Sequence, residues 1–566
     1  MPTCTGIPAT FISRNTGKLV AHMNLASLIV ELSDPERYPF PVTEVNVVQT
    51  HISVVFLAGQ FVYKIKKPVQ LSFLDFSTLD LRRRICDEEV RLNRRLAPDV
   101  YLEVVAVTDD DSGVRFEGMG KTVEWAVKMR RLPEEATLEQ RVLRNEIDAE
   151  HVRLLAKRLA EFHANAARNE SIAAFGRFEI VARNIRENFA VSAPTIGRTI
   201  NPAVRERLLT LTEQSLAELK PLIESRAARG VPCDTHGDLH LDHVYLFPDR
   251  PPPADLVIID CIEFNERFRY TDPVADMAFL AMDFEFHGRR DLAAALTESY
   301  FQARGDLEGQ RLLSLYVSYR AAVRGKVDGL QLDEQEIPEA ARAAALIRAR
   351  GHWLLALGAL ETPNRRPGLI LIGGLPGTGK STLARRLAEL ADFQVIRSDV
   401  VRKELAGLAP ESVADRENGE GIYTPEWSDR TYAECLRRAE ELLFEGGRVI
   451  VDANFREEQR RKDFFDAALR WGVPVLFLVC EADPDDIKAR LDARRGDASD
   501  ADWSVYQRLA KGWEEPGERT KSALRRIPAG KSADAAYQAA CHALTEAGLA
   551  IGGGDVALTP PLSKGG

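Results

Sequence analysis

The fold of the first half of the chain is decided by the stretch Thr235-His236-Gly237-Asp238-Leu239-His240-Leu241-Asp242-His243. A further carboxylate, Asp260, follows about 20 residues on, directly after the apolar run Val257-Ile258-Ile259. Phosphoryl transfer depends on positioning and charge neutralisation, so its sites need carboxylates for magnesium and for the acceptor hydroxyl group. The pattern of Asp238 and Asp260 around a short apolar run therefore indicates a phosphate-transfer site.

A second stretch, Gly374-Leu375-Pro376-Gly377-Thr378-Gly379-Lys380-Ser381, fits the phosphate-loop pattern G-x-x-x-x-G-K-[ST] in full. It follows the apolar run 369–372, which is typical of a strand buried on both faces of a parallel sheet, and it precedes helical sequence. Backbone N–H groups of such a loop cradle phosphate oxygens at the helix N-terminus. The expected nucleotide ligands are Gly374, Pro376, Gly377, Thr378, Gly379, Lys380, Ser381 and Thr382, with Ser381 also on magnesium.

The first stretch resembles the catalytic region of the aminoglycoside phosphotransferase family, and the likeness continues through Asp272-Pro273-Val274-Ala275-Asp276-Met277-Ala278. The resemblance implies an α+β protein-kinase-like domain with a small β-rich N-terminal lobe and a helical C-terminal lobe. The local patterns agree, because apolar alternation on both sides of Ala58-Gly59-Gln60 predicts a β-hairpin.

By the same resemblance, Asp238 would be the catalytic base, Asp260 a magnesium ligand and Lys64 the lysine on the ATP phosphates. Lys66, on the same strand face, is the second candidate for that lysine. Glu88 would be the helical partner of Lys64, with Glu89 as the alternative.

The sequence departs from the family at two places. His243 stands where the family has a metal-binding Asn, so an imidazole would be the second metal ligand. Gln49-Thr50-His51-Ile52-Ser53 stands in place of a glycine-rich nucleotide loop. A zinc cluster of His236, His240 and His243 is an alternative interpretation, although no cysteine or distant histidine completes it.

The second half resembles the P-loop kinases that include gluconate kinase, the polynucleotide 5′-kinases and the zeta-toxin kinases, which are often described as AAA-type domains. The likeness rests on the phosphate loop and on Ser398–Leu405, Val449–Phe455 and Arg490–Arg495. It implies an α/β domain with a parallel sheet. It also implies roles for Asp399 as the acceptor's base, Arg402 on the acceptor, Asp452 in magnesium's water shell, and Arg490 and Arg494 as a lid.

Length and composition fit a soluble protein of several domains. The chain has 566 residues, of which 45% are hydrophobic and 28% charged, and a net charge of −10. This charge argues against a general nucleic-acid or membrane-surface binder. The seven cysteines form no paired motif, and no apolar run approaches the ~20 residues of a membrane span. These observations predict a cytoplasmic protein.

The expected domain organisation has five parts. Residues 1–24 form a loose leader, 25–361 the phosphotransferase-like domain, 362–367 a linker with two prolines, 368–550 the P-loop domain, and 551–566 a disordered tail.

Two phosphate-handling motifs predict a bifunctional phosphotransferase with two ATP–Mg²⁺ sites, each acting on a hydroxyl group of a small molecule. Two alternatives stay open. One is a nucleic-acid 5′-end kinase, which would need a basic groove, whereas only scattered pairs such as Arg365-Arg366 are present. The other is a P-loop kinase regulated by a nucleotide-binding pseudokinase domain, which His243 and the missing glycine loop favour.

Overall fold

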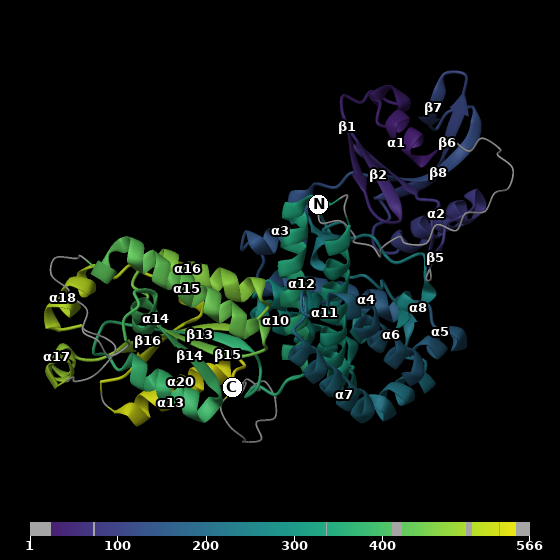
Figure 1. Ribbon diagram of the computed structural model, residues 1–566. Helices are drawn as coiled ribbons and strands as arrows, with labels where there is room; N and C mark the ends of the chain where they lie inside the picture. Colours follow the sequence, from purple (N-terminus) through teal and green to yellow (C-terminus); the bar gives the residue numbers. More distant parts are fainter. Residues whose placement is uncertain are drawn as a thin grey trace. The chain divides into compact units, whose positions relative to one another are not determined.

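A computed structural model describes residues 24–71, 74–334, 337–409, 421–493, 501–530 and 532–550 (Figure 1). The chain divides into two compact units. Unit 1 comprises Met1–Thr199 and Thr212–Ala356, and unit 2 comprises Ile200–Leu211 and Leu357–Gly566. The expected leader up to residue 23 and the expected tail lie outside the described residues. No sequence pattern indicated that residues 200–211 belong with the second unit.

Unit 1 begins with an antiparallel six-stranded sheet of order β1-β2-β3-β8-β6-β7. Its strands are β1 (Val45–Gln49), β2 (Ser53–Ala58), β3 (Phe61–Lys66), β6 (Tyr101–Asp110), β7 (Gly113–Phe116) and β8 (Lys121–Arg130). The predicted hairpin is confirmed as β2 and β3, with Ala58 opposite Phe61. α1 (Leu25–Leu32) packs with the core on one face of the sheet, and α2 (Leu79–Asn93) with the core on the other.

The remainder of unit 1 is mainly helical, as the resemblance implied. Its helices are α3 (Leu138–Leu143), α4 (Ala149–Asn165), α5 (Glu170–Phe175), α6 (Phe178–Val191), α7 (Pro202–Ala228, shared with unit 2), α8 (Glu266–Arg269), α9 (Pro273–Phe286), α10 (Arg290–Arg304), α11 (Leu313–Leu330) and α12 (Glu339–Leu360). The short strand pairs are β4 (Gln70–Leu71) with β5 (Leu74–Asp75), β9 (Cys233–Asp234) with β12 (Tyr270–Thr271), and β10 (Val244–Leu246) with β11 (Leu256–Ile258).

The apolar residues of 139–162 are spaced as in one continuous helix, but the structure divides this segment into two helices. α3 ends at Leu143, Asn145 adopts a left-handed φ of 58°, and α4 begins at Ala149. Asp148 caps α4 by accepting hydrogen bonds from the N–H groups of Glu150 and His151. The apolar spacing of the sequence does not reveal the end of α3, whereas the capping residue Asp148 marks the start of α4.

Unit 2 contains a parallel five-stranded sheet of order β14-β15-β13-β16-β17, as the sequence predicted for this half. Its strands are β13 (Gly368–Gly373), β14 (Phe393–Arg397), β15 (Arg448–Asp452), β16 (Val475–Glu481) and the unforeseen edge strand β17 (Leu524–Pro528). Its helices are α13 (Lys380–Ala391), α14 (Ser398–Leu405), α15 (Pro425–Phe444), α16 (Glu458–Arg470), α17 (Pro484–Ala493), α18 (Trp503–Lys511), α19 (Glu518–Ser522) and α20 (Ala533–Glu546). α13 and α20 cover one face of the sheet, and α15 and α16 cover the other (Figure 1).

None of the helices in the described parts of the chain has both the length and the apolar character that crossing a membrane requires.

Candidate functional site

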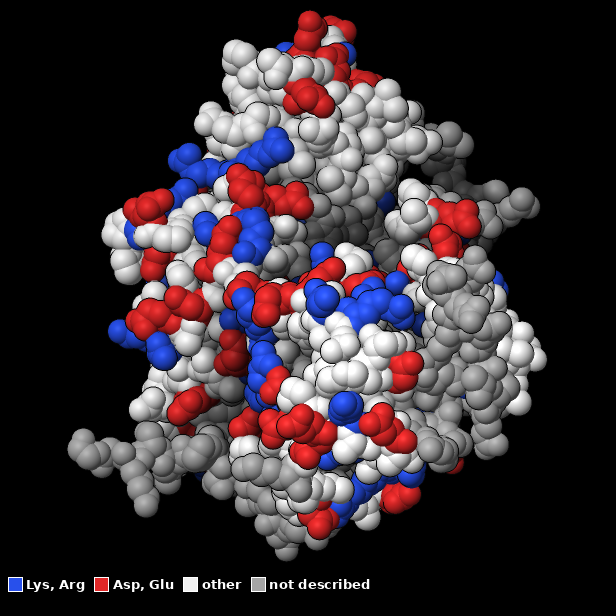
Figure 2. Space-filling model, turned by 90° about the vertical axis from the view of Figure 1, so that its left-hand side faces the viewer, with Lys and Arg blue, Asp and Glu red and all other residues white. Residues whose placement is uncertain are grey.

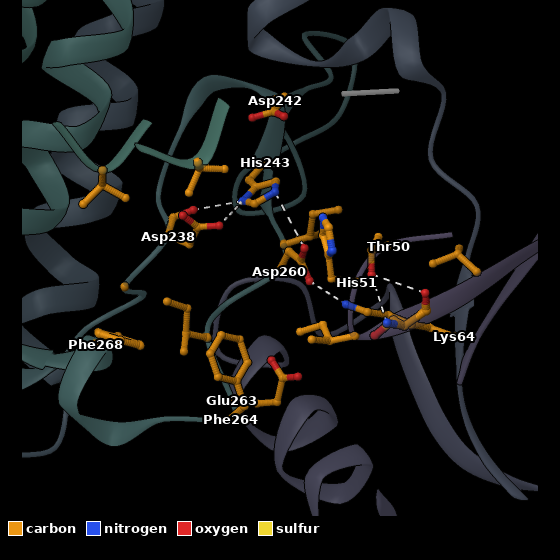
Figure 3. Close-up of a pocket in the computed structure, with 18 of the residues that line it drawn as sticks. Thr50, His51, Lys64, Asp238, Asp242, His243, Asp260, Glu263, Phe264 and Phe268 are labelled. Atoms are coloured by element: carbon orange, nitrogen blue, oxygen red, sulfur yellow. Dashed lines mark hydrogen bonds and ion pairs between the residues drawn. The ribbon is translucent and has the colours of Figure 1, made fainter. Parts of the chain in front are cut away.

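The first candidate site lies where two short strands of unit 1 carry acidic loops. The loop before β10 contributes Asp238 and His243, and Asp260 follows β11. Val244 pairs with Ile258 in the β10–β11 ladder, so the two loops are held side by side. Figure 3 shows Lys64, Asp260, His243 and Asp238 following one another along this site.

The loop that carries Asp238 is fixed from beneath by Asp276 of α9. The buried Asp276 carboxylate accepts hydrogen bonds from the N–H groups of His236 (2.6 Å) and Gly237 (2.9 Å). Arg320 of α11 donates to the Gly237 carbonyl at 3.0 Å. Gly237 has a φ of 88°, a left-handed conformation that side-chain-bearing residues adopt at a cost. The Asp-Pro-x-x-Asp motif thus positions the loop, since Asp272 caps α9 and pairs with Arg226.

Lys64 of β3 links the sheet to the carboxylate that follows β11. Its ammonium lies 2.8 Å from Asp260 Oδ1 and 2.8 Å from Glu89 Oε1. Burial opposes its charge, yet Asp260 and Glu89 hold the pKa of Lys64 well above its usual value. Lys64 is therefore a cation held beside the expected magnesium ligand.

The assignment of Glu88 as the helical partner of Lys64 was wrong. Glu89 points inward from α2 and is fully buried at the lysine, whereas Glu88 is bound by Arg91 on the same helix and approaches Arg269. Adjacent helical residues point about 100° apart, so at most one of the two glutamates can face the sheet. Glu89, the alternative in the sequence analysis, holds this position.

We expect Glu89→Gln to weaken ATP binding at this site and to destabilise unit 1 by about 3 kcal/mol, because removing one member of a buried ion pair leaves charges uncompensated. Glu88→Gln is the matched control, and its loss should be below about 1 kcal/mol because the Glu88–Arg91 pair is partly exposed. Urea unfolding and ATP titration of both variants measure the difference. Equal losses would show that the buried position has no special role.

A second buried pair lies beneath Lys64. Lys66 is fully buried, with its ammonium 2.6 Å from Glu89 Oε2 and 2.5 Å from Glu263 Oε1. Glu89 therefore serves both lysines, and Glu263 lies three residues after Asp260. This pair ties β3 to the segment that follows Asp260. Lys66 is thus engaged in the interior, which leaves Lys64 as the lysine beside Asp260.

The backbone at Asp260 is also held in place. Its φ of 65° is left-handed, a conformation that costs a non-glycine residue about 1 kcal/mol or more. The Asp260 N–H donates to the Tyr101 hydroxyl at 3.1 Å, and the Cys261 N–H donates to Asn93 Oδ1 at 2.9 Å. Residues of the sheet and of α2 thereby set the direction of the Asp260 carboxylate.

Two histidines stabilise the charged form of Asp238. Burial works against its charge, but His240 and His243 hold the pKa of Asp238 well below its usual range. His243 contacts the Asp238 carbonyl through Nδ1 at 2.9 Å, and its Nε2 lies 3.7 Å from Asp260 Oδ2. His243 thus lies between Asp238 and Asp260, next to both.

A cavity of about 800 Å³ opens over these residues. One side of it is apolar and includes Val48, Leu57, Val62 and Met129, and the other includes Asp238, Asn188 and Lys326. The β1–β2 turn at Thr50–Ile52 also lines it, in the place where a glycine-rich loop was absent from the sequence. The Ser53 N–H donates to Thr50 Oγ1, so side-chain hydrogen bonding stabilises this short turn.

Lys326 of α11 is a cation with a neutral partner. Its ammonium donates to Asn188 Oδ1 at 2.8 Å, and no carboxylate of the described residues pairs with it. Burial lowers the pKa of Lys326 to about 8, while Glu187 raises it and Arg267 lowers it further. The polar side of the cavity therefore offers a positive charge that the protein does not neutralise by direct contact.

The second candidate site is the phosphate loop of unit 2. Gly374, Gly377 and Gly379 have left-handed φ values of 128°, 82° and 96°. A Cβ atom on Gly374 would lie 2.6 Å from the Cys480 carbonyl oxygen, so the loop needs glycine there. Lys380 donates to the Leu375 carbonyl at 2.8 Å, inside the curve of the loop. Pro376 and Thr378 lie within the loop, and Thr382 lies in the first turn of α13.

The expected magnesium residues of this site meet at one sheet edge. Ser381 Oγ donates to Asp452 Oδ2 at 2.6 Å, and Asp452 pairs in register with Ile372 of β13 and Arg397 of β14. Burial raises the pKa of Asp452, although Lys380 and Ser381 oppose this shift. Asp399 lies in the first turn of α14, two residues after β14 ends at the same edge.

The arginines that the sequence predicts for the second site have different surroundings. Arg490 of α17 lies at the phosphate loop, where it donates to the carbonyls of Ala529 (3.0 Å), Gly530 (3.1 Å) and Gly377 (3.4 Å). Arg402 is buried, donates to the Ile422 carbonyl at 2.8 Å and lies over the Tyr423 ring, so it also has a structural role. Arg494 lies outside the described residues.

Several residues of the first site were not identified from the sequence. Glu263 and Tyr101 carried no motif, and Lys326 lies in an ordinary helical pattern. Asp276 belongs to the Asp-Pro-x-x-Asp motif, but the sequence alone does not show that it contacts the loop before β10.

Comparison with known proteins finds a different protein family in each half of the chain. Residues 76–313 match the family described as the phosphotransferase enzyme family, and residues 369–516 match the AAA domain. The uncharacterized protein Rv2004c of Mycobacterium tuberculosis is 34% identical over 478 residues, which cover 83% of this chain and 91% of that protein. The uncharacterized protein Mb2027c of Mycobacterium bovis matches to the same extent.

Two solved structures are similar to parts of the chain. A gluconokinase from Sinorhizobium meliloti 1021 is 18% identical and covers 32% of this chain and 94% of its own, with a TM-score of 0.24. A choline/ethanolamine kinase family protein from Mesorhizobium loti is 14% identical and covers 56% of this chain and 92% of its own, with a TM-score of 0.33. The family matches support a phosphotransferase. The chain therefore belongs to the same family as the two mycobacterial proteins, and it joins a phosphotransferase-family domain to a P-loop kinase-like domain of the AAA type.

Proposed function

We propose that the chain is a bifunctional kinase with two ATP–Mg²⁺ sites, each of which transfers the γ-phosphate to a hydroxyl group of a small molecule. The observation that carries this proposal for the first site is the Lys64–Asp260 contact of 2.8 Å at a cavity that Asp238 also lines. A cation for phosphates, a carboxylate for metal and a carboxylate for the acceptor are the parts that phosphoryl transfer requires.

The chemistry of the donors supports ATP and magnesium at both sites. Asp260 offers the oxygen ligands that magnesium prefers, whereas His243 offers a softer nitrogen. In unit 2, Ser381 and Asp452 would hold the metal, and the glycine-rich loop leaves its backbone open to phosphate. Magnesium would neutralise the charge that develops on the transferred phosphoryl group.

The protein's own residues would then direct the transfer. Lys64 and Lys380 would hold the ATP phosphates at their respective sites, and Arg490 would add positive charge near the second. Asp238 and Asp399 would orient the acceptor hydroxyl and receive its proton. The apolar side of the cavity in unit 1 has the character that a nucleotide base requires.

A screen of the full-length chain against a metabolite pool, with ADP formation as the readout, tests this proposal. Each product is then assigned with Lys64→Ala and Lys380→Ala, which each disable one site. The proposal expects one class of product to disappear in each variant. If every product depended on Lys380 alone, the alternative hypothesis would be favoured, in which unit 1 is a pseudokinase domain that regulates unit 2.

The nucleic-acid alternative receives less support. On the face drawn in Figure 2, Lys and Arg side chains are interspersed with Asp and Glu side chains. A 5′-end kinase requires a continuous basic path for the nucleic-acid backbone. The screen includes a 5′-hydroxyl oligonucleotide, and its phosphorylation would favour this alternative for unit 2.

The acceptor of the first site should be anionic, because no carboxylate of the described residues pairs with Lys326 in the cavity. Lys326 is protonated below its pKa of about 8. We therefore expect kcat/KM for the acceptor to fall about tenfold per pH unit above pH 8. Lys326→Gln should have a lower kcat/KM below pH 8 and should lack this alkaline decline. A decline that persisted in Lys326→Gln would assign the titration to another group.

A further inference from the structure

The loop before β10 carries a compact group of metal-ligating side chains, of which the proposed kinase reaction uses Asp238 and His243 but not His240. One ligand atom each from Asp238, His240 and His243 lies within 4.8 Å of the others. The two imidazole rings are tilted by 35° with their centroids 3.8 Å apart. His240 has no role in the proposed phosphotransferase mechanism.

Both histidines are held by their Nδ1 atoms. Asp242 contacts His240 Nδ1, and the Asp238 carbonyl accepts from His243 Nδ1 at 2.9 Å. In protein metal sites, a carboxylate or carbonyl on one ring nitrogen fixes the tautomer and directs the other nitrogen at the metal. The same arrangement here directs Nε2 of His240 at Asp238 Oδ2. His243 faces Asp238 Oδ2 with Nδ1 at 4.0 Å and Asp260 with Nε2 at 3.7 Å, so its Nδ1 would exchange the Asp238 carbonyl for the metal.

His240 Nε2 supplies an independent indication of a ligand. His240 is 2% exposed, and its Nε2 has no hydrogen-bond partner in the described part of the chain. This atom faces Asp238 Oδ2 at 3.4 Å. A buried polar atom without a hydrogen bond costs about 1 to 3 kcal/mol, so a bound cation at this position would remove that cost.

We propose that Asp238, His240 and His243 form a binding site for a transition-metal ion of the Zn²⁺ class. Two imidazole nitrogens and one carboxylate suit Zn²⁺ or Co²⁺, whereas magnesium prefers oxygen ligands throughout. Ligands about 2.1 Å from a tetrahedral ion lie about 3.4 Å apart, so small side-chain rotations close the observed spacing. His236 is excluded from the set because its Nε2 is bound to the Ile259 carbonyl at 2.9 Å.

Occupation of this site would affect transfer by unit 1. Asp238 is the acceptor's proposed base, and its carboxylate cannot orient the acceptor while it binds the metal. The ion should therefore inhibit transfer by unit 1 and leave transfer by the phosphate-loop site unchanged. This consequence rests on the proposed function, but metal binding itself does not.

Cobalt provides a spectroscopic probe of the site in the full-length chain. Titration with Co²⁺, without nucleotide, should give one equivalent of visible d–d absorption of four-coordinate strength, and Zn²⁺ should remove it. His240→Gln should weaken cobalt binding at least 100-fold, and Asp242→Asn about 10- to 100-fold, as expected for a partner of a ligating histidine.

His151→Gln is the matched control, because the exposed His151 pairs with Asp148 on the surface at 2.8 Å and should leave binding unchanged. Circular dichroism checks that each variant folds. The proposal is overturned if the wild-type chain shows no d–d band, if the band has the thiolate charge transfer of cysteine ligands, or if both His240→Gln and Asp242→Asn retain full affinity. Transfer with magnesium but without cobalt binding would overturn this inference alone.

Discussion

The Asp238→Asn substitution should lower phosphoryl transfer by unit 1 about 100- to 10,000-fold while ATP affinity stays within about twofold. Loss of a positioned general base has an effect of this size. ATP affinity is spared because the phosphates are assigned to Lys64 and the metal to Asp260, which pair with each other at 2.8 Å. Product formation is measured in a Lys380→Ala background, in which transfer by the phosphate-loop site is lowered about 100- to 1,000-fold.

Asp249→Asn is the control for this experiment, because Asp249 is an exposed aspartate in the turn after β10. It should transfer phosphate at the wild-type rate. If Asp238→Asn were as active as Asp249→Asn, Asp238 would not be the base. A chain in which neither variant nor the wild type formed product at unit 1 would support the pseudokinase alternative.

Lys380→Ala should lower transfer by unit 2 about 100- to 1,000-fold, the usual effect of removing one preorganised positive or hydrogen-bonding group from a transition state. The lysine lies inside the loop curve, where it donates to the Leu375 carbonyl. Its removal should change folding little, because the lysine is only half-buried at the start of α13. Rate and thermal unfolding are measured on the same preparation.

Lys488→Ala, on the exposed side of α17, is the matched control and should keep the wild-type rate. A Lys380→Ala chain that retained full transfer by unit 2 would show that the loop does not hold the transferred phosphate. A variant with a lowered unfolding temperature would instead point to a structural role for the lysine.

Much of the fold was predictable because its signals are local. The β2–β3 hairpin follows from alternation around Gly59, and the parallel sheet follows from continuous apolar runs such as 369–372. The phosphate loop was evident because its glycines must adopt left-handed conformations and its lysine has a fixed position.

The unpredicted details depend on long-range packing. The sequence could not distinguish Glu88 from Glu89, because the answer depends on which face of α2 meets β3. Lys66 and Glu263 come together across 197 residues, and no local pattern records such a pairing. The association of residues 200–211 with unit 2 is likewise a tertiary feature.

Equilibrium binding of ATP with Mg²⁺, at saturating nucleotide, counts the ATP sites on the chain. If both sites bind ATP, the wild-type chain should bind two nucleotides, Lys64→Ala one, Lys380→Ala one and the double variant none. A wild-type stoichiometry of one, abolished by Lys380→Ala and unaffected by Lys64→Ala, would show that unit 1 has no ATP site.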